Sequence, residues 1–378
     1  MIQVGHARRV RIVADDLTGA LDSAAPLSRC VGPLPVFWGL SAAEAGAGSF
    51  ALDSDSRDAP RPTSEWLGAL RGGDLAYKKI DSLLRGNTAR EVAACLASGW
   101  FSSALIAPAF PAQQRITRGG CQFWRADPSG PWHAVACDLT AELRGRGVGL
   151  RLGSTATDIS GRGFFLCDAE SEDDLGALVV AGERLAPPVL WCGSAGLARA
   201  LAGVPAGSAL PRLEPPLLLM IGSHHPVTLA QIRALAKHAP DFVVRVCLDS
   251  ENELEPVIGA LARILARSGR AALVIEVPDG TGAAVAAPFF DRVLTAAVAR
   301  LERPRSVVVT GGATLHRLVG VLGARALLVT GEPLPGVPRS LLQGGSWNGA
   351  VVISKSGAFG DPGLLIRLLE SAKGGGHD

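Results

Sequence analysis

The sequence predicts an α/β protein of two domains, each a mainly parallel sheet flanked by helices. Its 378 residues exceed what a single hydrophobic core usually holds, so two domains are the default. Hydrophobic residues make up 48% of the chain and charged residues 19%, which is a globular composition with ample core. Short apolar runs alternate with longer amphipathic segments, and this pattern is typical of parallel strands joined by helices.

In the first half, the predicted strands are short apolar runs that end in polar or turn-forming loops. They cover residues 10–14, 36–39, 50–53, 74–77, 102–107, 164–167 and 189–191. Helices are predicted from a Thr18 cap to about residue 29, and over residues 63–70, 88–97, 168–185 and 194–201.

Residues 203–216 are rich in Pro, Gly and Ala and mark a domain boundary. We therefore expect an N-terminal domain at 1–205, a linker at 206–216, a C-terminal domain at 217–373 and a disordered tail at 374–378. Strands of the second half are predicted at 217–221, 242–247, 271–277, 306–310, 326–330 and 350–354. Its helices are predicted at 228–237, 254–265 and 284–301, from after residue 314 to residue 323, and at 362–372.

Composition narrows the class of protein. The net charge of +2 is too small for the broad basic face of a nucleic-acid-binding protein, and no uncharged apolar stretch reaches the ~18 residues of a membrane span. No signal peptide is recognised, and none of the seven cysteines forms a C-x-x-C pair. We expect reduced, mostly buried thiols and a cytoplasmic location. The oligomeric state is left open, and a homodimer is one alternative.

The segment from Lys78 to Asn87 places two lysines, an aspartate, a serine and an arginine between a predicted strand and a predicted helix. Anionic ligands bind at such junctions in α/β proteins, because helix N-terminal N–H groups point at them. Side chains alternate along a strand, so Lys78 and Lys79 should point to opposite faces. We expect Lys79 to face the ligand.

Asp15 and Asp16 follow the first strand, where they could coordinate Mg²⁺, accept a proton from a substrate hydroxyl or cap the next helix. Arg57 follows another strand, either to bind a carboxylate or to form surface ion pairs. A fourth strand ends in the turn at 108–111. Four such strand ends in one half predict a single site at the carboxyl edge of the sheet.

The second half carries three glycine loops between strand and helix, at 222–223, 311–314 and 355–360. Glycine lets the backbone approach phosphate oxygens, so these loops are candidate phosphate sites. No P-loop, dinucleotide fingerprint, G-x-S-x-G elbow or zinc spacing occurs, and the pair His224-His225 is not expected to bind a metal. Acids and cations in one domain and phosphate loops in the other suit phosphoryl transfer to a small acid in an interdomain active-site cleft.

Together these segments resemble the four-carbon acid sugar kinases, which act on D-threonate, D-erythronate or 3-oxo-tetronate. The resemblance is carried by residues 14–20, 78–87, 107–111 with Arg115 and 119–120, and by residues 222–223, 311–314, 335–338 and 355–360. It implies an ATP-dependent kinase that phosphorylates the terminal C4 hydroxyl. The implied ATP contacts are Ser223, Gly311, Gly312, Ala313, Thr314 and Gly357. The implied substrate contacts are Asp15, Asp16, Arg57, Lys79, Asp81, Ser82 and Arg85.

We hypothesise that Asp16 is the base or the residue that orients the hydroxyl, with Asp15 or Asp81 assisting or binding Mg²⁺. Arg57, Lys79 and Arg85 would hold the substrate carboxylate or neutralise charge on the phosphate. Two alternatives stay open: a non-catalytic sensor of sugar acids and nucleotides, and a phosphate-binding lyase or dehydrogenase on a similar scaffold.

Overall fold

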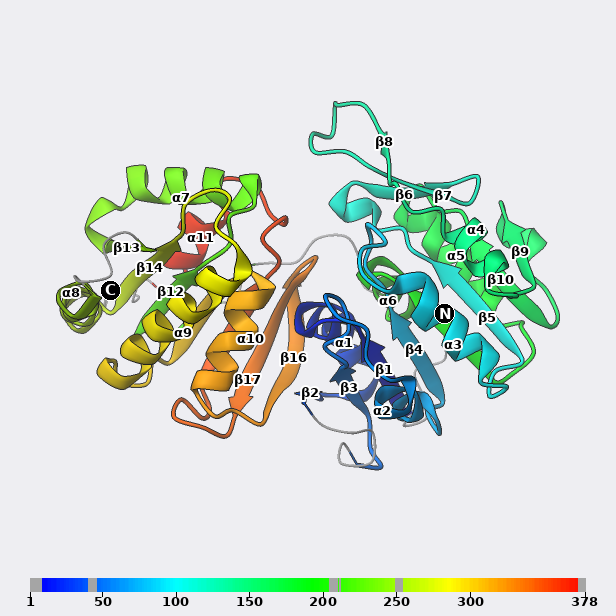
Figure 1. The fold of residues 1–378 in the computed structure, drawn as a ribbon, viewed down its shortest axis with the longest axis horizontal. Coiled ribbons are helices and arrows are strands. Elements are labelled where there is room, and N and C mark those ends of the chain that lie inside the picture. The colour runs from blue at the N-terminus through cyan, green and yellow to red at the C-terminus, as the bar shows by residue number, and fades with distance from the viewer. Residues whose placement is uncertain (1–8, 40–45, 204–209, 211, 249–253, 373–378) are drawn as a thin grey trace, which may run out of the picture. The chain divides into compact units, whose positions relative to one another are not determined.

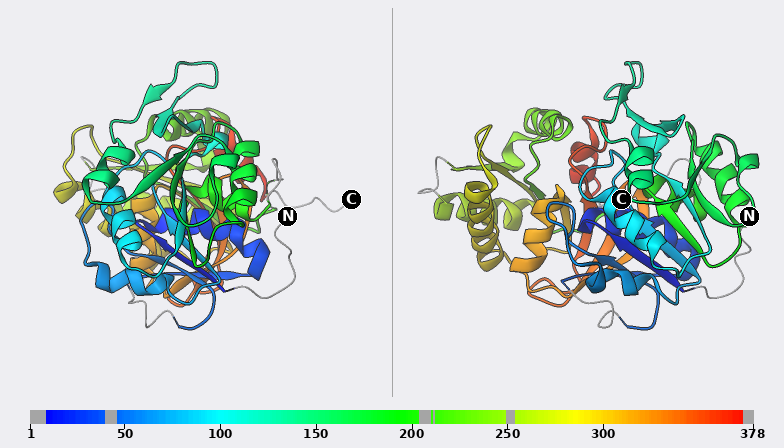
Figure 2. Two further views of the ribbon diagram at one scale, coloured as in Figure 1. Left: turned by 90° about the vertical axis from the view of Figure 1, so that its right-hand side faces the viewer. Right: turned by 45° about the vertical axis from the view of Figure 1, so that its right-hand side comes forward.

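The structure, a computed structural model, describes residues 9–39, 46–203, 210, 212–248 and 254–372. The chain divides into two compact units, residues 1–206 with 329–331 and residues 207–328 with 332–378 (Figure 1). In each unit the strands are mainly parallel and helices lie on both faces, as predicted (Figure 2). The expected tail at 374–378 and most of residues 206–211 lie outside the described residues.

The sheet of the first unit is parallel, in the order β2-β3-β1-β4-β11-β5-β10-β9. Because β3, β1 and β4 are neighbours, the polar loops that follow them meet at one edge. The strands are β1 (Val10–Ala14), β2 (Leu34–Trp38), β3 (Phe50–Asp53), β4 (Leu75–Lys79), β5 (Ser103–Ala107), β9 (Leu150–Gly153), β10 (Gly163–Cys167) and β11 (Val189–Gly193).

Helices cover both faces of this sheet. On one side α1 (Leu17–Val31), α5 (Glu172–Gly182) and α6 (Ala195–Leu201) pack side by side. On the other side α2 (Thr63–Trp66), α3 (Thr88–Ala97) and α4 (Leu139–Gly145) share one hydrophobic core with alternate strand residues. The predicted helix at 63–70 is α2 continued by a 3₁₀ turn, Leu67–Leu70. The predicted helix at 168–185 begins only at α5, where Ser171 forms a capping box with Asp174.

A small antiparallel sheet of β6 (Arg115–Arg118), β7 (Cys121–Trp124) and β8 (His133–Ala134) projects from the first unit (Figure 1). The sequence analysis missed it, together with α4 and β9. These elements are short, and their alternation of apolar and polar residues is too brief to identify a strand. The sheet still matters for the site, because β7 carries Gln122.

The sheet of the second unit has the order β13-β14-β12-β15-β18-β17-β16. Its strands are β12 (Leu217–Ile221), β13 (Val243–Cys247), β14 (Arg270–Glu276), β15 (Ser306–Thr310), β16 (Ala326–Leu334), β17 (Val337–Gln343) and β18 (Val351–Lys355). β17 runs antiparallel to β18 and was missed in the sequence analysis. The strands β12, β15 and β18 are neighbours, so their loops also meet.

In the described part of the second unit, five helices flank the sheet: α7 (Pro226–His238), α8 (Leu254–Ser268), α9 (Ala283–Arg300), α10 (Gly312–Val321) and α11 (Leu364–Glu370). α7 and α11 pack together over a core that includes Leu219 and Ile353, and α8, α9 and α10 pack side by side. Across the described ranges we find no helix whose length and hydropathy would let it span a bilayer. Only Cys95, Cys167 and Cys192 are fully buried, so the expectation of mostly buried thiols is wrong.

Candidate active site

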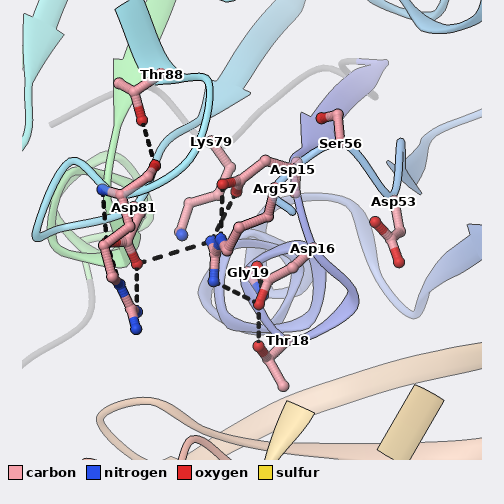
Figure 3. A network of polar contacts seen from close by, with 12 residues as sticks. Asp15, Asp16, Thr18, Gly19, Asp53, Ser56, Arg57, Lys79, Asp81 and Thr88 are labelled. Atoms are coloured by element: carbon pink, nitrogen blue, oxygen red, sulfur yellow. Dashed lines mark hydrogen bonds and ion pairs between the residues drawn. The ribbon is translucent and has the colours of Figure 1, made fainter. Parts of the chain in front are cut away.

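Arg57 lies at the centre of a group of aspartates at the edge where β3, β1 and β4 end (Figure 3). Its Nε and Nη2 donate to the two Asp15 carboxylate oxygens, both at 2.8 Å. Its Nη1 donates to Asp16 Oδ2 at 2.7 Å, and its Nη2 lies 3.7 Å from Asp81 Oδ1. One guanidinium thus joins three carboxylates from two strand ends that are far apart in the sequence.

Asp16 is the N-cap of α1, because its Oδ1 accepts a hydrogen bond from the Gly19 N–H at 2.9 Å. The prediction that Thr18 caps this helix is therefore wrong: the Thr18 hydroxyl instead donates to Asp16 Oδ2 at 2.5 Å. The alternatives for Asp16 do not exclude each other, since one oxygen caps the helix while the other faces Arg57. Its side chain is 22% exposed, against 3% for Asp15 and 7% for Asp81. Asp16 is thus the carboxylate of this group that a substrate reaches most easily.

Asp81 is held by Arg85, whose Nε and Nη2 each donate to one of its oxygens at 2.8 Å. Asp81 also accepts the backbone N–H groups of Leu83 and Arg85, which fixes the turn after β4. The Ser82 carbonyl oxygen accepts a hydrogen bond from Gln122 Nε2 at 2.7 Å, so strand β7 of the small antiparallel sheet stabilises this turn.

The two lysines of β4 separate as strand alternation predicted. Lys78 is fully buried on the α3 side, where its Nζ lies 2.8 Å from Glu91 Oε2. Glu91 also accepts a short hydrogen bond from the hydroxyl of Ser56, the residue before Arg57. Lys79 lies on the α1 side of the sheet, close to the first turn of α1. A Cβ atom added to Gly19 in that turn would lie 2.9 Å from Lys79 Nζ. Among the described residues, Lys79 Nζ has no hydrogen-bond or ion-pair partner, and it lies beside the aspartates (Figure 3).

Electrostatics keep the central carboxylates ionised. Burial alone would raise the pKa of Asp15, but Arg57, Lys79 and Lys78 outweigh burial and hold the pKa below its ordinary value. Burial would also raise the pKa of Asp81, but Arg85 and Arg57 together outweigh burial and lower that pKa strongly. The pKa of Arg57 is raised despite its burial, because Asp16 and Asp15 surround it. Asp15, Asp81 and Arg57 therefore all carry their charges at neutral pH.

Asp53 behaves in the opposite way. It ends β3 and is buried, and it accepts only the Asp55 N–H at 2.7 Å among the contacts described. Burial, with the nearby Asp16, Asp55 and Asp15, raises its pKa to about 8. Figure 3 shows its side chain apart from the Arg57 group. The sequence analysis placed Asp53 at the end of a predicted strand but did not identify it as a neutral acid.

The fourth predicted strand end lies further along the sheet than expected. β11 separates β4 from β5, so the turn at 108–111 is not next to the loop after β4. Ser194, which follows β11, links the two: its hydroxyl donates to the Ala109 carbonyl oxygen at 2.6 Å, and its own carbonyl oxygen accepts from Tyr77. Three of the four predicted loops are therefore direct neighbours.

In the second unit the three glycine loops pack against one another. The Gly311 N–H donates to the Lys355 carbonyl oxygen at 3.0 Å, and a Cβ on Gly357 would lie 1.9 Å from Ser223 Oγ. Only glycine allows that approach. Thr314 is buried in the first turn of α10, while Gly312 and Ala313 beside it are accessible. All six residues implied as ATP contacts thus gather at the ends of β12, β15 and β18.

Within the described residues, no group of three or more His, Cys, Asp or Glu side chains could hold a metal ion alone. Asp15, Asp16 and Asp81 are nevertheless hard oxygen donors of the kind that Mg²⁺ prefers. Mg²⁺ is commonly bound by one or two such carboxylates together with substrate phosphates. The donor set of the first unit therefore fits an Mg²⁺ ion that is shared with a phosphate ligand.

Comparison with known proteins identifies the family of this chain. A D-threonate kinase of Cupriavidus necator is 33% identical to this chain over 411 residues, covering 94% of this chain and 95% of the relative. This chain belongs to the four-carbon acid sugar kinase family. Two further D-threonate kinases, from Bordetella bronchiseptica and Salmonella typhimurium, are each 27% identical and cover 96% and 95% of this chain and 97% of their own lengths. The resemblance drawn from the sequence is confirmed.

Family models and solved structures agree with this membership. A model described as a sugar-binding N-terminal domain matches residues 10–133, and one described as a nucleotide-binding C-terminal domain matches residues 218–365. A crystal structure from Salmonella typhimurium has a TM-score of 0.72 at 22% identity, covering 95% of this chain and 98% of that chain. One from Haemophilus influenzae has a TM-score of 0.65 at 19% identity, covering 96% and 98%. These two likenesses show the fold.

Three buried charged side chains, Glu91, Lys355 and Arg115, were given no role in the sequence analysis. Glu91 lies on the inner face of α3, where a carboxylate needs a partner, and Lys78 supplies it. Lys355 ends an apolar strand directly before a glycine loop, a place where a lysine is unexpected unless it has a ligand or counter-ion. Arg115 is a third such group: burial lowers its pKa to about 10 although Asp81 is near.

Proposed function

We propose that this protein is an ATP-dependent kinase that transfers the γ-phosphate to the C4 hydroxyl of a four-carbon sugar acid. D-threonate is the first candidate substrate, because three relatives that align over nearly their whole length are D-threonate kinases. Membership of a kinase family argues against the sensor and against the lyase or dehydrogenase. The single observation that carries the proposal is the Arg57 group, in which three carboxylates meet at one sheet edge beside Lys79, which has no partner among the described residues.

The roles within the first unit follow from exposure and pairing. Asp16 is the most accessible of the three carboxylates around Arg57, so we assign it the substrate hydroxyl, as base or orienting group. The hydroxyl oxygen bonds to the γ-phosphorus, the bond from that phosphorus to the bridging oxygen of ADP breaks, and the proton passes to Asp16. Arg57 is already occupied by Asp15 and Asp16, so it acts here as a positioning residue.

The substrate carboxylate needs cations that are accessible or unpaired. Lys79 has no partner among the described residues, and the Arg85 side chain is 61% exposed. We assign the sugar acid to these two side chains and to the Ser82 hydroxyl. A lysine and an arginine beside ionised aspartates also select for a ligand that has both a carboxylate and hydroxyl groups, as a sugar acid does.

ATP would bind to the second unit, on the backbone N–H groups at the start of α10 and the loops of Ser223 and Gly357. Its phosphate oxygens, with Asp81 as the protein carboxylate, would hold Mg²⁺. When bound, the ion neutralises charge on the phosphoryl group. Arg85, which now occupies Asp81, is exposed enough to turn away and contact the substrate instead.

A coupled assay of ADP release across four-carbon acids tests this function. We expect turnover with Mg²⁺–ATP and D-threonate, and formation of the 4-phosphate by phosphorus NMR. D-erythronate, L-threonate and 3-oxo-tetronate rank the substrate preference. Binding of a tetronate without ADP release would favour the sensor, and binding of NAD in place of ATP would favour the dehydrogenase.

A further inference from the structure

Lys355 is a buried lysine without an acidic partner in the described part of the chain. It is the last residue of β18, and only 1% of its surface is exposed to solvent. Its Nζ donates to the Ser356 carbonyl oxygen at 3.1 Å. Lys78 provides the contrast, since it is equally buried but has Glu91 at 2.8 Å. A buried cation without a counter-ion is costly, so the site of Lys355 is suited to an anion.

The position of Lys355 indicates which anion. Its carbonyl oxygen accepts the Gly311 N–H, and Gly357, two residues further on, packs against Ser223, so Lys355 lies where the three glycine loops meet. Its neighbour in register on β15 is Thr310, and register partners in a parallel sheet point to the same face. Within the ranges that the structure describes, the buried Thr310 hydroxyl has no hydrogen-bond partner. Two buried polar groups at adjacent strand ends therefore lack the partners that an anion would supply.

We propose that Lys355 is a phosphate-binding residue of the nucleotide site, whose ammonium contacts the β- or γ-phosphate oxygens of ATP. The inference rests on the proposed kinase function. It adds a charged side chain to a site that otherwise offers backbone N–H groups and hydroxyls. A lysine that reaches phosphates from beside a glycine loop is an effective combination, because the loop fixes the phosphates and the ammonium neutralises them.

The protonation state of Lys355 makes the proposal measurable. Burial alone lowers its pKa to about 7. Charged or titratable side chains also occur on the elements next to Lys355. Asp361 and Arg367 pair with each other, the His225 ring accepts the Val227 N–H, and Arg339 lies on β17. A phosphate beside the ammonium would favour the protonated form and raise the pKa again. At pH 8 nucleotide binding should therefore take up most of one proton.

Isothermal titration of the intact protein with Mg²⁺ and a non-hydrolysable ATP analogue tests this. Titrations at pH 8 in buffers of different ionisation enthalpy give affinity and proton uptake together. We expect uptake in the wild type and none in Lys355→Met, with the analogue bound about 10- to 100-fold more weakly by the variant. Binding of D-threonate should not change. Lys237→Met removes an exposed lysine of α7 and should match the wild type in all three readouts.

Nucleotide binding by the wild type without proton uptake would overturn the proposal. This measurement needs no variant, so the proposal can be tested even if the Lys355→Met protein fails to fold. Equal affinity of a folded Lys355→Met protein would also overturn it. Failure of the kinase function looks different: the analogue still binds with proton uptake, but no four-carbon acid is phosphorylated. A wild type that binds no nucleotide would overturn both.

Discussion

Arg57 illustrates how one side chain can organise a site. A guanidinium has five N–H donors in a planar fork, and here three of its hydrogen bonds go to Asp15 and Asp16. The main chain supports the same geometry, because the N–H groups of Ser56 and Arg57 both donate to the Asp15 carbonyl oxygen at 3.1 Å. Lysine could not replace Arg57, since a single ammonium cannot satisfy two carboxylates in this arrangement.

Replacing Asp16 with Asn tests its catalytic role. Asn keeps an oxygen for the helix cap but loses the acceptor for Arg57 and Thr18, so stability should fall modestly. The amide also cannot accept a proton. We expect kcat to fall by about 10² to 10⁴, the usual contribution of a general base, with a smaller change in KM for the sugar acid. Asp138→Asn is the matched control, because Asp138 also caps a helix, α4, outside the Arg57 group. A kcat within about threefold of wild type would remove Asp16 from the role.

Asp53 should make the protein less stable as the pH rises. In the unfolded chain an aspartate loses its proton near pH 4, whereas folded Asp53 holds it up to about pH 8. Between these values the native state binds the extra proton, so the free energy of unfolding falls with increasing pH. Asp53→Asn cannot ionise and should gain at least about 1 kcal/mol over wild type between pH 5 and pH 8. Urea unfolding at both pH values measures this, and exposed Asp58→Asn should show no such trend.

The strand β4 shows how an element divides chemistry between its two faces. Alternation sends Lys79 towards α1 and the aspartates, and sends Lys78 towards α3. The buried pair of Lys78 and Glu91 then reaches Ser56, in the loop that carries Arg57. A helix, a strand and a loop are thus connected through one buried carboxylate.

Loss of the charge on Glu91 should therefore destabilise this connection. Glu91→Gln keeps an acceptor for Ser56 but leaves the Lys78 ammonium buried without a counter-ion, at an expected cost of about 3 kcal/mol. Adding Lys78→Met removes the stranded charge and should recover most of that loss. A double-variant cycle by urea unfolding measures the coupling. If the second substitution recovers nothing, the cost does not come from an unpaired lysine.

Taken as a whole, the molecule places different chemistry on its two units. Carboxylates and cations gather at the strand ends of the first unit, and glycine loops with a helix N-terminus gather in the second. The family models described as sugar-binding and nucleotide-binding divide the chain in the same order. Each ligand should therefore protect its own unit.

Hydrogen exchange with each ligand separately tests this division. D-threonate should slow exchange most in residues 15–19, 54–57 and 80–85, and the ATP analogue most in residues 222–225, 311–314 and 356–360. Ligand contact suppresses the local opening from which amides exchange, so protection identifies the binding loops. Strongest protection of residues 311–314 by D-threonate would contradict the assignment.

Sequence alone determined the family, the α/β class and the loops that carry the chemistry, because glycine turns and charged residues at strand ends are local signals. It placed Asp15, Arg57 and Asp81 in one site, since parallel strands end at a common edge. It could not give the order of the strands, so it did not foresee that β11 separates β5 from β4. Strand order depends on long-range pairing, which leaves no local pattern.

Only the tertiary structure decided which charges are paired. Arg57 binds Asp15 and Asp16, Lys78 binds Glu91, and Lys355 has no carboxylate among the described residues. In the sequence these are three similar cations near strand ends. Burial and partners distinguish them, because the cost of a charge depends on the atoms around it. That difference supports the roles that we propose: positioning for Arg57, structural support for Lys78 and phosphate binding for Lys355.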